Sequence, residues 1–322
     1  MRYVTVGDLE VPELFLGCGN FGGIGSPAEF YGKGDNQKAA FTLMDAALAA
    51  GVTMFDTANT YAGGVSEDWI GRWLTSRGTR DNVYLTTKVS GPVGPGPDDH
   101  GLSRKHIRTQ IDASLNRLQT DRIDLYLAHA PDEATPIAET VAAFDELVRE
   151  GKIRAYGLSN YSAAQLVEAL TAVAESGVTK PANLQCGYNL LDRTESGSFD
   201  VCRGAGIAFT AYSPLAGGLL TGKYRGDQPP PPDTRMAVRP TPLPHLSHDS
   251  LYRALGELAV VADRYGVPLT TLSLAWLRAD PNVTALVIGP RTPAQLATMC
   301  DALDLDLTED ECAELTAIVV NA

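Results

Sequence analysis

The 322-residue chain has little that would tie it together covalently. Its five cysteines are odd in number and widely scattered, and no two of them form a CxxC pair, so we expect neither a disulfide framework nor a zinc site. No apolar run approaches the ~18 residues that cross a membrane, and the first residues lack the apolar stretch of a secretory signal. These absences predict a reduced, cytoplasmic protein.

Basic residues are also scarce relative to acidic ones. The chain has 26 Lys and Arg against 39 Asp and Glu, a formal net charge of −13. A surface of this sign repels nucleic-acid backbones and anionic lipids, so neither nucleic acid nor membrane is expected as a partner. An anionic ligand would need basic groups placed locally, and the oligomeric state stays open.

What the chain does have is a regular alternation of short β-like runs with helical patterns. Ile107, Ile111, Leu115 and Leu118 follow one another at spacings of four, four and three, which is typical of one helical face. Parallel strands joined by helical crossovers fit this alternation. We therefore predict an α/β fold, a (β/α)8 TIM barrel with eight parallel strands, forming one domain over residues 1–322. The eight predicted strands are Leu14–Leu16, Thr53–Phe55, Val83–Thr87, Leu125–Ala128, Ala155–Leu158, Asn183–Gln185, Ala208–Tyr212 and Ala285–Ile288.

Two segments lie outside this repeat. Tyr3–Val11 is expected to form a short N-terminal hairpin with Gly7-Asp8 at its turn. The segment Gly226–Leu246 is rich in proline and makes the interval before strand 8 much longer than the others. Two interpretations of this long loop stay open: a disordered surface loop, or a lid that selects substrate at the carboxyl end of the barrel.

The segment Gly17–Gly22 matches the dinucleotide fingerprint GxGxxG and follows a strand. A Rossmann site needs a helix to begin directly after the glycines and an acidic residue ~20 positions later. Here helical periodicity resumes only near Gln37, and the next acid at a strand end is Asp56. We therefore interpret this segment, with Gly19 and Asn20, as the loop after strand 1 of the barrel.

Four polar residues lie where early strands end or just beyond. Asp56 ends the second strand, Tyr61 follows five residues later, Lys88 ends the third strand and His129 ends the fourth. Singly, each has an ordinary structural interpretation, such as a cap, a rim charge or packing. The carboxyl ends of barrel strands converge on one face, so together the four predict a catalytic cluster.

The residue types suggest the chemistry. A tyrosine with pKa ~10 becomes a better acid when a nearby ammonium stabilises its phenolate, and Lys88 would supply that charge while Asp56 orients it. His129 would donate a hydrogen bond to a substrate carbonyl, and Tyr61 would protonate its oxygen as a hydride reaches the carbon. The five histidines show no metal-ligand spacing, so no metal is expected.

These residues lie in segments that resemble the aldo-keto reductase family. The matching segments, in order along nearly the whole chain, are GVTMFDTANTYAGGVSE (51–67), DRIDLYLAHAPD (121–132), GKIRAYGLSNY (151–161), AYSPLAGGLLTGKY (211–224) and IGPRTPAQL (288–296). The resemblance implies a TIM barrel that binds NADPH without a Rossmann fold. It also implies that Tyr61 is the proton donor and that Asp56, Lys88 and His129 complete a tetrad.

The resemblance further implies a set of cofactor-binding positions. Ser159, Asn160 and Gln185 match ligands of the nicotinamide carboxamide, and Tyr212 matches an aromatic residue that stacks on the ring. Arg291 would bind the 2′-phosphate with its guanidinium fork and favour NADPH over NADH. The full predicted set is Gly19, Asn20, Asp56, Ser159, Asn160, Gln185, Tyr212, Ser213, Leu215, Gly217, Leu219, Gly289, Arg291 and Gln295.

The chain departs from the family pattern at the adenosine end. Thr298-Met299 stands where the family often has Glu-Asn, and the run before Arg291 lacks a frequent lysine or serine. These departures leave NADH use open. Asn20-Phe21 replaces a more usual Thr-Trp or Thr-Met, which is expected to reshape the substrate pocket.

Two functions from different classes follow. The first is an NADPH-dependent reductase of an aldehyde or ketone, with the small carbonyl compound as its partner; a keto-sugar or antibiotic intermediate would change only the substrate. The second is a redox-sensing or regulatory subunit with slow turnover, like the potassium-channel β subunits that share this fold. The physiological substrate and the direction of reaction stay open.

Overall fold

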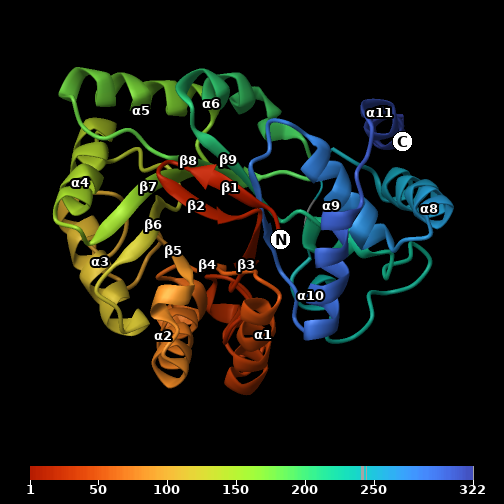
Figure 1. The fold of residues 1–322 in the computed structure, drawn as a ribbon, viewed down its shortest axis with the longest axis horizontal. Helices are drawn as coiled ribbons and strands as arrows, with labels where there is room; N and C mark the ends of the chain where they lie inside the picture. Colours follow the sequence, from red (N-terminus) through yellow and green to blue (C-terminus); the bar gives the residue numbers. More distant parts are fainter. Residues whose placement is uncertain (241–242, 244, 322) are drawn as a thin grey trace.

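The computed structural model describes residues 1–240, 243 and 245–321. Eight parallel strands close into a barrel, and helices cover its outside, which confirms the predicted (β/α)8 TIM barrel. In Figure 1 the helices α1 to α6 follow one another around the sheet in chain order. Each crossover places the next strand beside the last, as short right-handed βαβ connections require.

The barrel strands pair in the order in which they occur along the chain, and the last closes on the first. Two of the predicted strands have the predicted bounds, and the others are longer or shifted by a few residues. The barrel strands are β3 (Leu14–Gly17), β4 (Met54–Asp56), β5 (Tyr84–Val89), β6 (Ile123–Ala128), β7 (Ile153–Ser159), β8 (Asn183–Gly187), β9 (Ala208–Tyr212) and β10 (Ala285–Ile288).

The helices around the barrel start and stop at recognisable sequence signals. Ser162 caps α5 in a reciprocal capping box with Gln165, and Gly151 follows α4 with a φ of +74°, which an L side chain rarely adopts. The α-helices are α1 (Gln37–Ala49), α2 (Val65–Arg77), α3 (Arg104–Leu118), α4 (Ile137–Arg149), α5 (Ala163–Ser176), α6 (Phe199–Ala205), α7 (Arg235–Val238), α8 (His248–Tyr265), α9 (Leu269–Ala279), α10 (Pro293–Cys300) and α11 (Glu309–Val320). The 3-10 helices are η1 (Ala28–Phe30), η2 (Tyr61–Gly64), η3 (Arg80–Asn82), η4 (Thr194–Ser198), η5 (Ala216–Thr221) and η6 (Asp301–Asp304).

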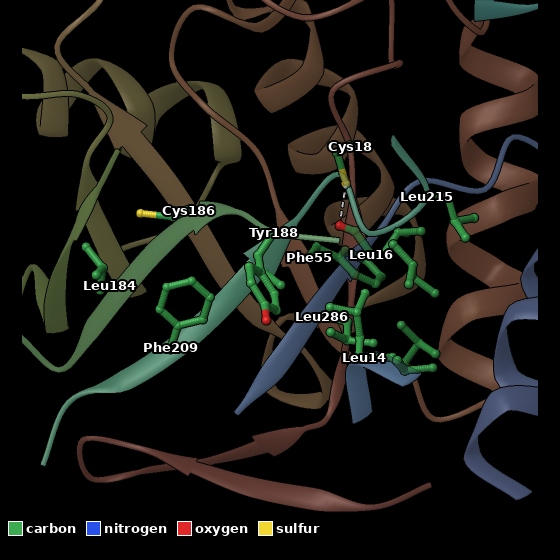
Figure 2. Close-up of a cluster of buried hydrophobic side chains, with 14 of the residues drawn as sticks. Leu14, Leu16, Cys18, Phe55, Leu184, Cys186, Tyr188, Phe209, Leu215 and Leu286 are labelled. Atoms are coloured by element: carbon green, nitrogen blue, oxygen red, sulfur yellow. Dashed lines mark hydrogen bonds between the residues drawn. The ribbon is translucent and has the colours of Figure 1, made fainter. Parts of the chain in front are cut away.

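The core has two parts because successive residues of a strand point to opposite faces. Leu14 and Leu16 of β3 belong to the larger cluster with Leu286 of β10, and Figure 2 shows several of its buried side chains. Phe15, between the two leucines, points the other way and joins the smaller cluster. Burial on both faces explains why these strands read as continuous apolar runs.

The predicted N-terminal hairpin is present. Its strands β1 (Tyr3–Val6) and β2 (Leu9–Pro12) pair antiparallel, and Gly7 at the turn has a φ of +60°. Val6, Leu9 and Val11 pack with residues at the amino ends of barrel strands, such as Ala208 and Ala285. The hairpin, red in Figure 1, therefore covers the end of the barrel opposite to the strands' carboxyl ends.

The described part of the long loop Gly226–Leu246 contains the short helix α7. Residues 241, 242 and 244 lie outside the described residues. Arg239, just after α7, donates from Nη1 to the carbonyl oxygen of Ile24 at 2.7 Å. The loop thus contacts the segment that follows β3, across the carboxyl end of the barrel. Among the described residues, no helix is long and apolar enough to cross a membrane.

Candidate active site

The four polar residues predicted from successive strand ends lie together at the carboxyl end of the barrel. Lys88 Nζ of β5 donates to Asp56 Oδ1 of β4 at 2.5 Å. The same nitrogen lies 5.3 Å from the centre of the Tyr61 ring. The rings of Tyr61 and His129 meet edge to face, with 5.7 Å between their centres. The structure therefore brings all four side chains into one cluster.

Tyr61 reaches the cluster because the chain turns sharply after β4. Tyr61 begins η2, and its backbone N–H donates to the carbonyl oxygen of Ala58 at 3.2 Å. Ala62 then adopts a φ of +50° before α2 begins at Val65. A left-handed non-glycine residue costs free energy and persists only where its surroundings fix it, so this turn holds the tyrosine in place.

The ion pair between Lys88 and Asp56 is buried, with both side chains at most 3% exposed. Lys88 also donates to the carbonyl oxygen of Thr57 at 2.9 Å, and Gln185 Nε2 donates to Asp56 Oδ2 at 2.9 Å. Burial by itself lowers the pKa of Lys88, but the charges of Asp56 and Tyr61 and their hydrogen bonds outweigh it and hold the pKa above its usual value. The lysine is therefore an ammonium at neutral pH.

Burial shifts the pKa values of Tyr61 and His129 in opposite directions. It raises the pKa of the Tyr61 phenol, and the ammonium of Lys88 partly offsets this effect. Burial, with the charge of Lys88 adding to it, lowers the pKa of His129 to about 3. At neutral pH the cluster thus holds a protonated phenol and an uncharged imidazole, which are both hydrogen-bond donors.

The depressed pKa of His129 predicts a pH-dependent stability. An unfolded histidine titrates near 6.5, so as pH falls from 6.5 to about 3 the unfolded chain binds a proton that the native chain does not. Above pH ~6.5 the titration of His129 costs no free energy of unfolding. Below that pH it lowers the free energy of unfolding by at most about 1.4 kcal/mol per pH unit. Urea unfolding at pH 7.5 and 5.5 should show a smaller loss for His129→Gln than for the unaltered chain. The exposed His248 provides a control, His248→Gln; equal losses for all three proteins would contradict the prediction.

A cavity of about 860 Å³ opens over the cluster. Its size falls within the range of ligand-binding pockets. Lys88 lies beneath its wall, and Leu219 packs in the apolar core instead of facing the cavity. The predicted residues that line it are Gly19, Asn20, Asp56, Tyr61, His129, Ser159, Asn160, Gln185, Tyr212, Ser213, Leu215, Gly217, Gly289, Arg291 and Gln295.

Asn160 links three parts of the cavity wall. Its Oδ1 accepts a hydrogen bond from the Tyr212 hydroxyl at 2.7 Å, and its Nδ2 donates to the carbonyl oxygen of His129 at 2.8 Å. Asn160 and Ser213 both have left-handed φ values, +62° and +52°. Strained residues of this kind concentrate at functional sites, and here both lie just after barrel strands.

The cavity wall has a charge opposite to that of the whole chain. Among the residues that the structure describes, its wall includes four cationic side chains, Lys223, Arg235, Arg239 and Arg291, and two carboxylates. Burial, and then the charge of Arg239, lowers the pKa of Arg235, so an anion beside it would be stabilised. This donor set fits a phosphate-containing ligand such as a nicotinamide dinucleotide. In the described ranges no group of His, Cys, Asp and Glu could hold a metal ion.

Three of these cations were missed from sequence. Lys223 lies in the segment AYSPLAGGLLTGKY, which was interpreted from its glycines and not from its lysine. Arg235 begins α7, and Arg239 follows the last residue of that helix. The signal was present, but the surrounding prolines favoured an irregular loop.

Comparison with known proteins agrees with this geometry. A model of the aldo/keto reductase family matches residues 13–320. The chain is 36% identical to the uncharacterized oxidoreductase YrpG of Bacillus subtilis, over 96% of this chain and 93% of that protein. It is 35% identical to a probable voltage-gated potassium channel subunit beta of Arabidopsis thaliana, over 83% of each. It is 32% identical to L-glyceraldehyde 3-phosphate reductase of Escherichia coli K12, over 98% of this chain and 90% of that enzyme.

The closed barrel and its relatives define the chain as an oxidoreductase built on a TIM barrel. More particularly, the chain belongs to the aldo/keto reductase family. The resemblance that the sequence segments indicated is thereby confirmed.

Proposed function

We propose that the protein reduces an aldehyde or a ketone to an alcohol, using a hydride from NADPH. The observation that supports this most directly is the contact of three groups: the buried ammonium of Lys88 donates to the carboxylate of Asp56 and lies 5.3 Å from the centre of the Tyr61 ring. A phenol beside a fixed ammonium is a general acid whose conjugate base is stabilised. The partner in the reaction is a small carbonyl compound.

Each member of the cluster has one task in this proposal. Tyr61 donates its proton to the carbonyl oxygen, and Lys88 stabilises the phenolate that remains. Asp56 keeps Lys88 charged and oriented, while uncharged His129 donates a hydrogen bond to the same oxygen. When bound, the nicotinamide supplies the hydride that adds to the carbonyl carbon.

The cavity wall suggests how the cofactor is held. Tyr212 would pack against the nicotinamide ring, and Ser159, Asn160 and Gln185 would bind its carboxamide. The segment from Ser213 to Leu219 would follow the pyrophosphate, and the cationic side chains of the cavity wall would bind its phosphates. Gly289, Arg291 and Gln295, which line the cavity, would bind the adenosine end.

Arg291→Ala tests the cofactor assignment. If Arg291 binds the 2′-phosphate, we expect the Kd for NADPH to rise about tenfold, because a charge-assisted bond is lost, while the Kd for NADH changes less than about twofold. Quenching of tryptophan fluorescence by each cofactor measures both constants. Arg225→Ala is the matched control, since Arg225 is an exposed arginine after η5 that does not line the cavity. An equal change for both cofactors would remove the assignment.

The reaction itself is tested by following NADPH oxidation against a panel of aldehydes, ketones and keto-sugars. The proposal requires turnover of at least one carbonyl class well above the rate without protein. A panel with no substrate, together with tight NADPH binding, would argue against a reductase.

That second outcome would favour the alternative function, a regulatory subunit that senses the redox state of its cofactor with slow turnover. Its support is the similarity to proteins named as probable potassium channel β subunits. The two functions share the cofactor and the barrel, so the rate of carbonyl turnover separates them.

A further inference from the structure

Arg291, the residue proposed to bind the 2′-phosphate, already has an anionic partner. Its Nε donates to Asp35 Oδ1 at 2.8 Å, and its Nη1 donates to the backbone carbonyl of Asp233 at 2.9 Å. Arg291 nevertheless lines the cavity, with its side chain 38% exposed. The guanidinium of Arg291 is therefore bonded to the protein and is also accessible to a ligand at this end of the cavity.

Asp35 is fixed in position by its backbone. Its N–H donates to the carbonyl oxygen of Asn20 at 2.7 Å, and its own carbonyl accepts from the N–H of Gly22 at 3.0 Å. The preceding residue must be glycine, because a Cβ on Gly34 would lie 2.0 Å from the carbonyl oxygen of Gly23. The carboxylate thus has little freedom to follow Arg291 if the arginine moves.

The carboxylate of Asp35 also depends on Arg291 for its charge. The residue is only 8% exposed, and its Oδ2 has no hydrogen-bond partner in the described part of the chain. Burial raises the pKa of Asp35, and the bond to Arg291 opposes that rise. An anion that draws the guanidinium away leaves a buried carboxylate without its cation, which is unfavourable.

We propose that Asp35 is a cofactor-specificity residue, which competes with the 2′-phosphate of NADPH for Arg291 and so brings the affinities for NADPH and NADH close together. The 2′-hydroxyl of NADH is uncharged, so it does not compete for Arg291 and leaves the ion pair with Asp35 intact. The inference rests on the proposed function, since it requires the adenosine end of a nicotinamide dinucleotide to lie beside Arg291. It deepens that function by naming both cofactors as usable.

A purely structural role for Asp35 gives a different expectation, namely no gain in the affinity for NADPH when the charge is removed. If the carboxylate only orients Arg291 through Nε, its charge is immaterial, and a neutral acceptor of the same shape does the same work. Asp35→Asn is that acceptor: the amide oxygen retains the bond to Nε, while the negative charge disappears. The variant therefore separates competition from orientation.

The test measures the Kd of four ligands by fluorescence quenching and calorimetry: NADPH, NADH, and the adenosine halves 2′,5′-ADP and 5′-AMP. In Asp35→Asn we expect NADPH and 2′,5′-ADP to bind about tenfold more tightly, while NADH and 5′-AMP change less than about twofold. Asp227→Asn removes an exposed acid of the long loop that does not line the cavity, and should change none of the four. The adenosine halves carry no hydride, so their binding does not depend on turnover.

An unchanged or weaker affinity for NADPH in Asp35→Asn, or an equal gain for both cofactors, would overturn the inference while leaving the proposed function intact. Failure of the unaltered chain to bind either cofactor would overturn both. Should the variant not fold, the unaltered chain still decides: competition predicts a Kd ratio of NADH to NADPH below about ten, and any larger ratio contradicts it.

Discussion

Tyr61→Phe is expected to lower kcat by about a hundredfold to ten-thousandfold, the usual contribution of a positioned general acid. The substitution removes only the hydroxyl, so the edge-to-face contact with the His129 ring remains. The Kd for NADPH should therefore change less than about twofold. Steady-state kinetics with the best carbonyl substrate, together with fluorescence titration of the cofactor, measure the two quantities separately.

The matched control for this variant is Tyr3→Phe. Tyr3 belongs to the hairpin at the other end of the barrel and is 53% exposed, so its hydroxyl has no part in the proposed chemistry. If Tyr61→Phe kept more than about a tenth of kcat, the proton would come from another group, and the proposed acid would be wrong.

Lys88→Met is expected to have the largest effect on stability. It leaves the carboxylate of Asp56 buried, with Gln185 as its remaining donor. Removing one partner of a buried ion pair costs about 3–5 kcal/mol because the other charge stays uncompensated. The free energy of unfolding in urea at pH 7 should fall by this amount, and kcat should fall too, because the phenolate of Tyr61 would lose its ammonium.

A double variant distinguishes the two effects. Asp56→Asn with Lys88→Met removes both charges, so most of the lost stability should return while kcat stays low. Lys38→Met, at an exposed position of α1, controls for the change of residue type. A single Lys88→Met variant as stable as the unaltered chain would show that the buried pair is not what holds this part of the barrel together.

Much of the fold could be predicted because barrel strands are buried on both faces and read as apolar runs. The predicted bounds of β9 and β10 are those of the structure. The strand β5 was predicted to end at Thr87 but continues to Val89. The charge of Lys88 indicated that the apolar strand ends just before it. In the structure Lys88 is a buried residue of β5, because its ammonium pairs with the carboxylate of Asp56.

The cluster of four polar residues could also be predicted in position, since the carboxyl ends of successive barrel strands meet. Their catalytic roles, and those of the cofactor positions, stay predictions. The ion pair that sequence reasoning missed depends on a contact between distant segments. Asp35 and Arg291 are 256 residues apart, and no periodicity connects a loop after the first barrel strand with one after the last.

Leu219 shows a different limit. Its segment lies at the cavity, and Gly217, two residues earlier, lines the wall, but Leu219 points into the core. The backbone of η5 has left-handed glycines at Gly217 and Gly218, so side-chain direction there follows no simple helical period. Spacing alone does not predict which residues of such a turn face the ligand.

The closure of one end of the barrel by the N-terminal hairpin has a practical and an evolutionary consequence. Because the chain starts on the side away from the cavity, a tag or a solid support joined to the first residue leaves the entrance clear. The same separation places substitutions in the hairpin and substitutions in the loops around the entrance at opposite ends of the barrel. Changes at distant sites have nearly independent effects on stability, so the two ends can change during evolution with little influence on each other.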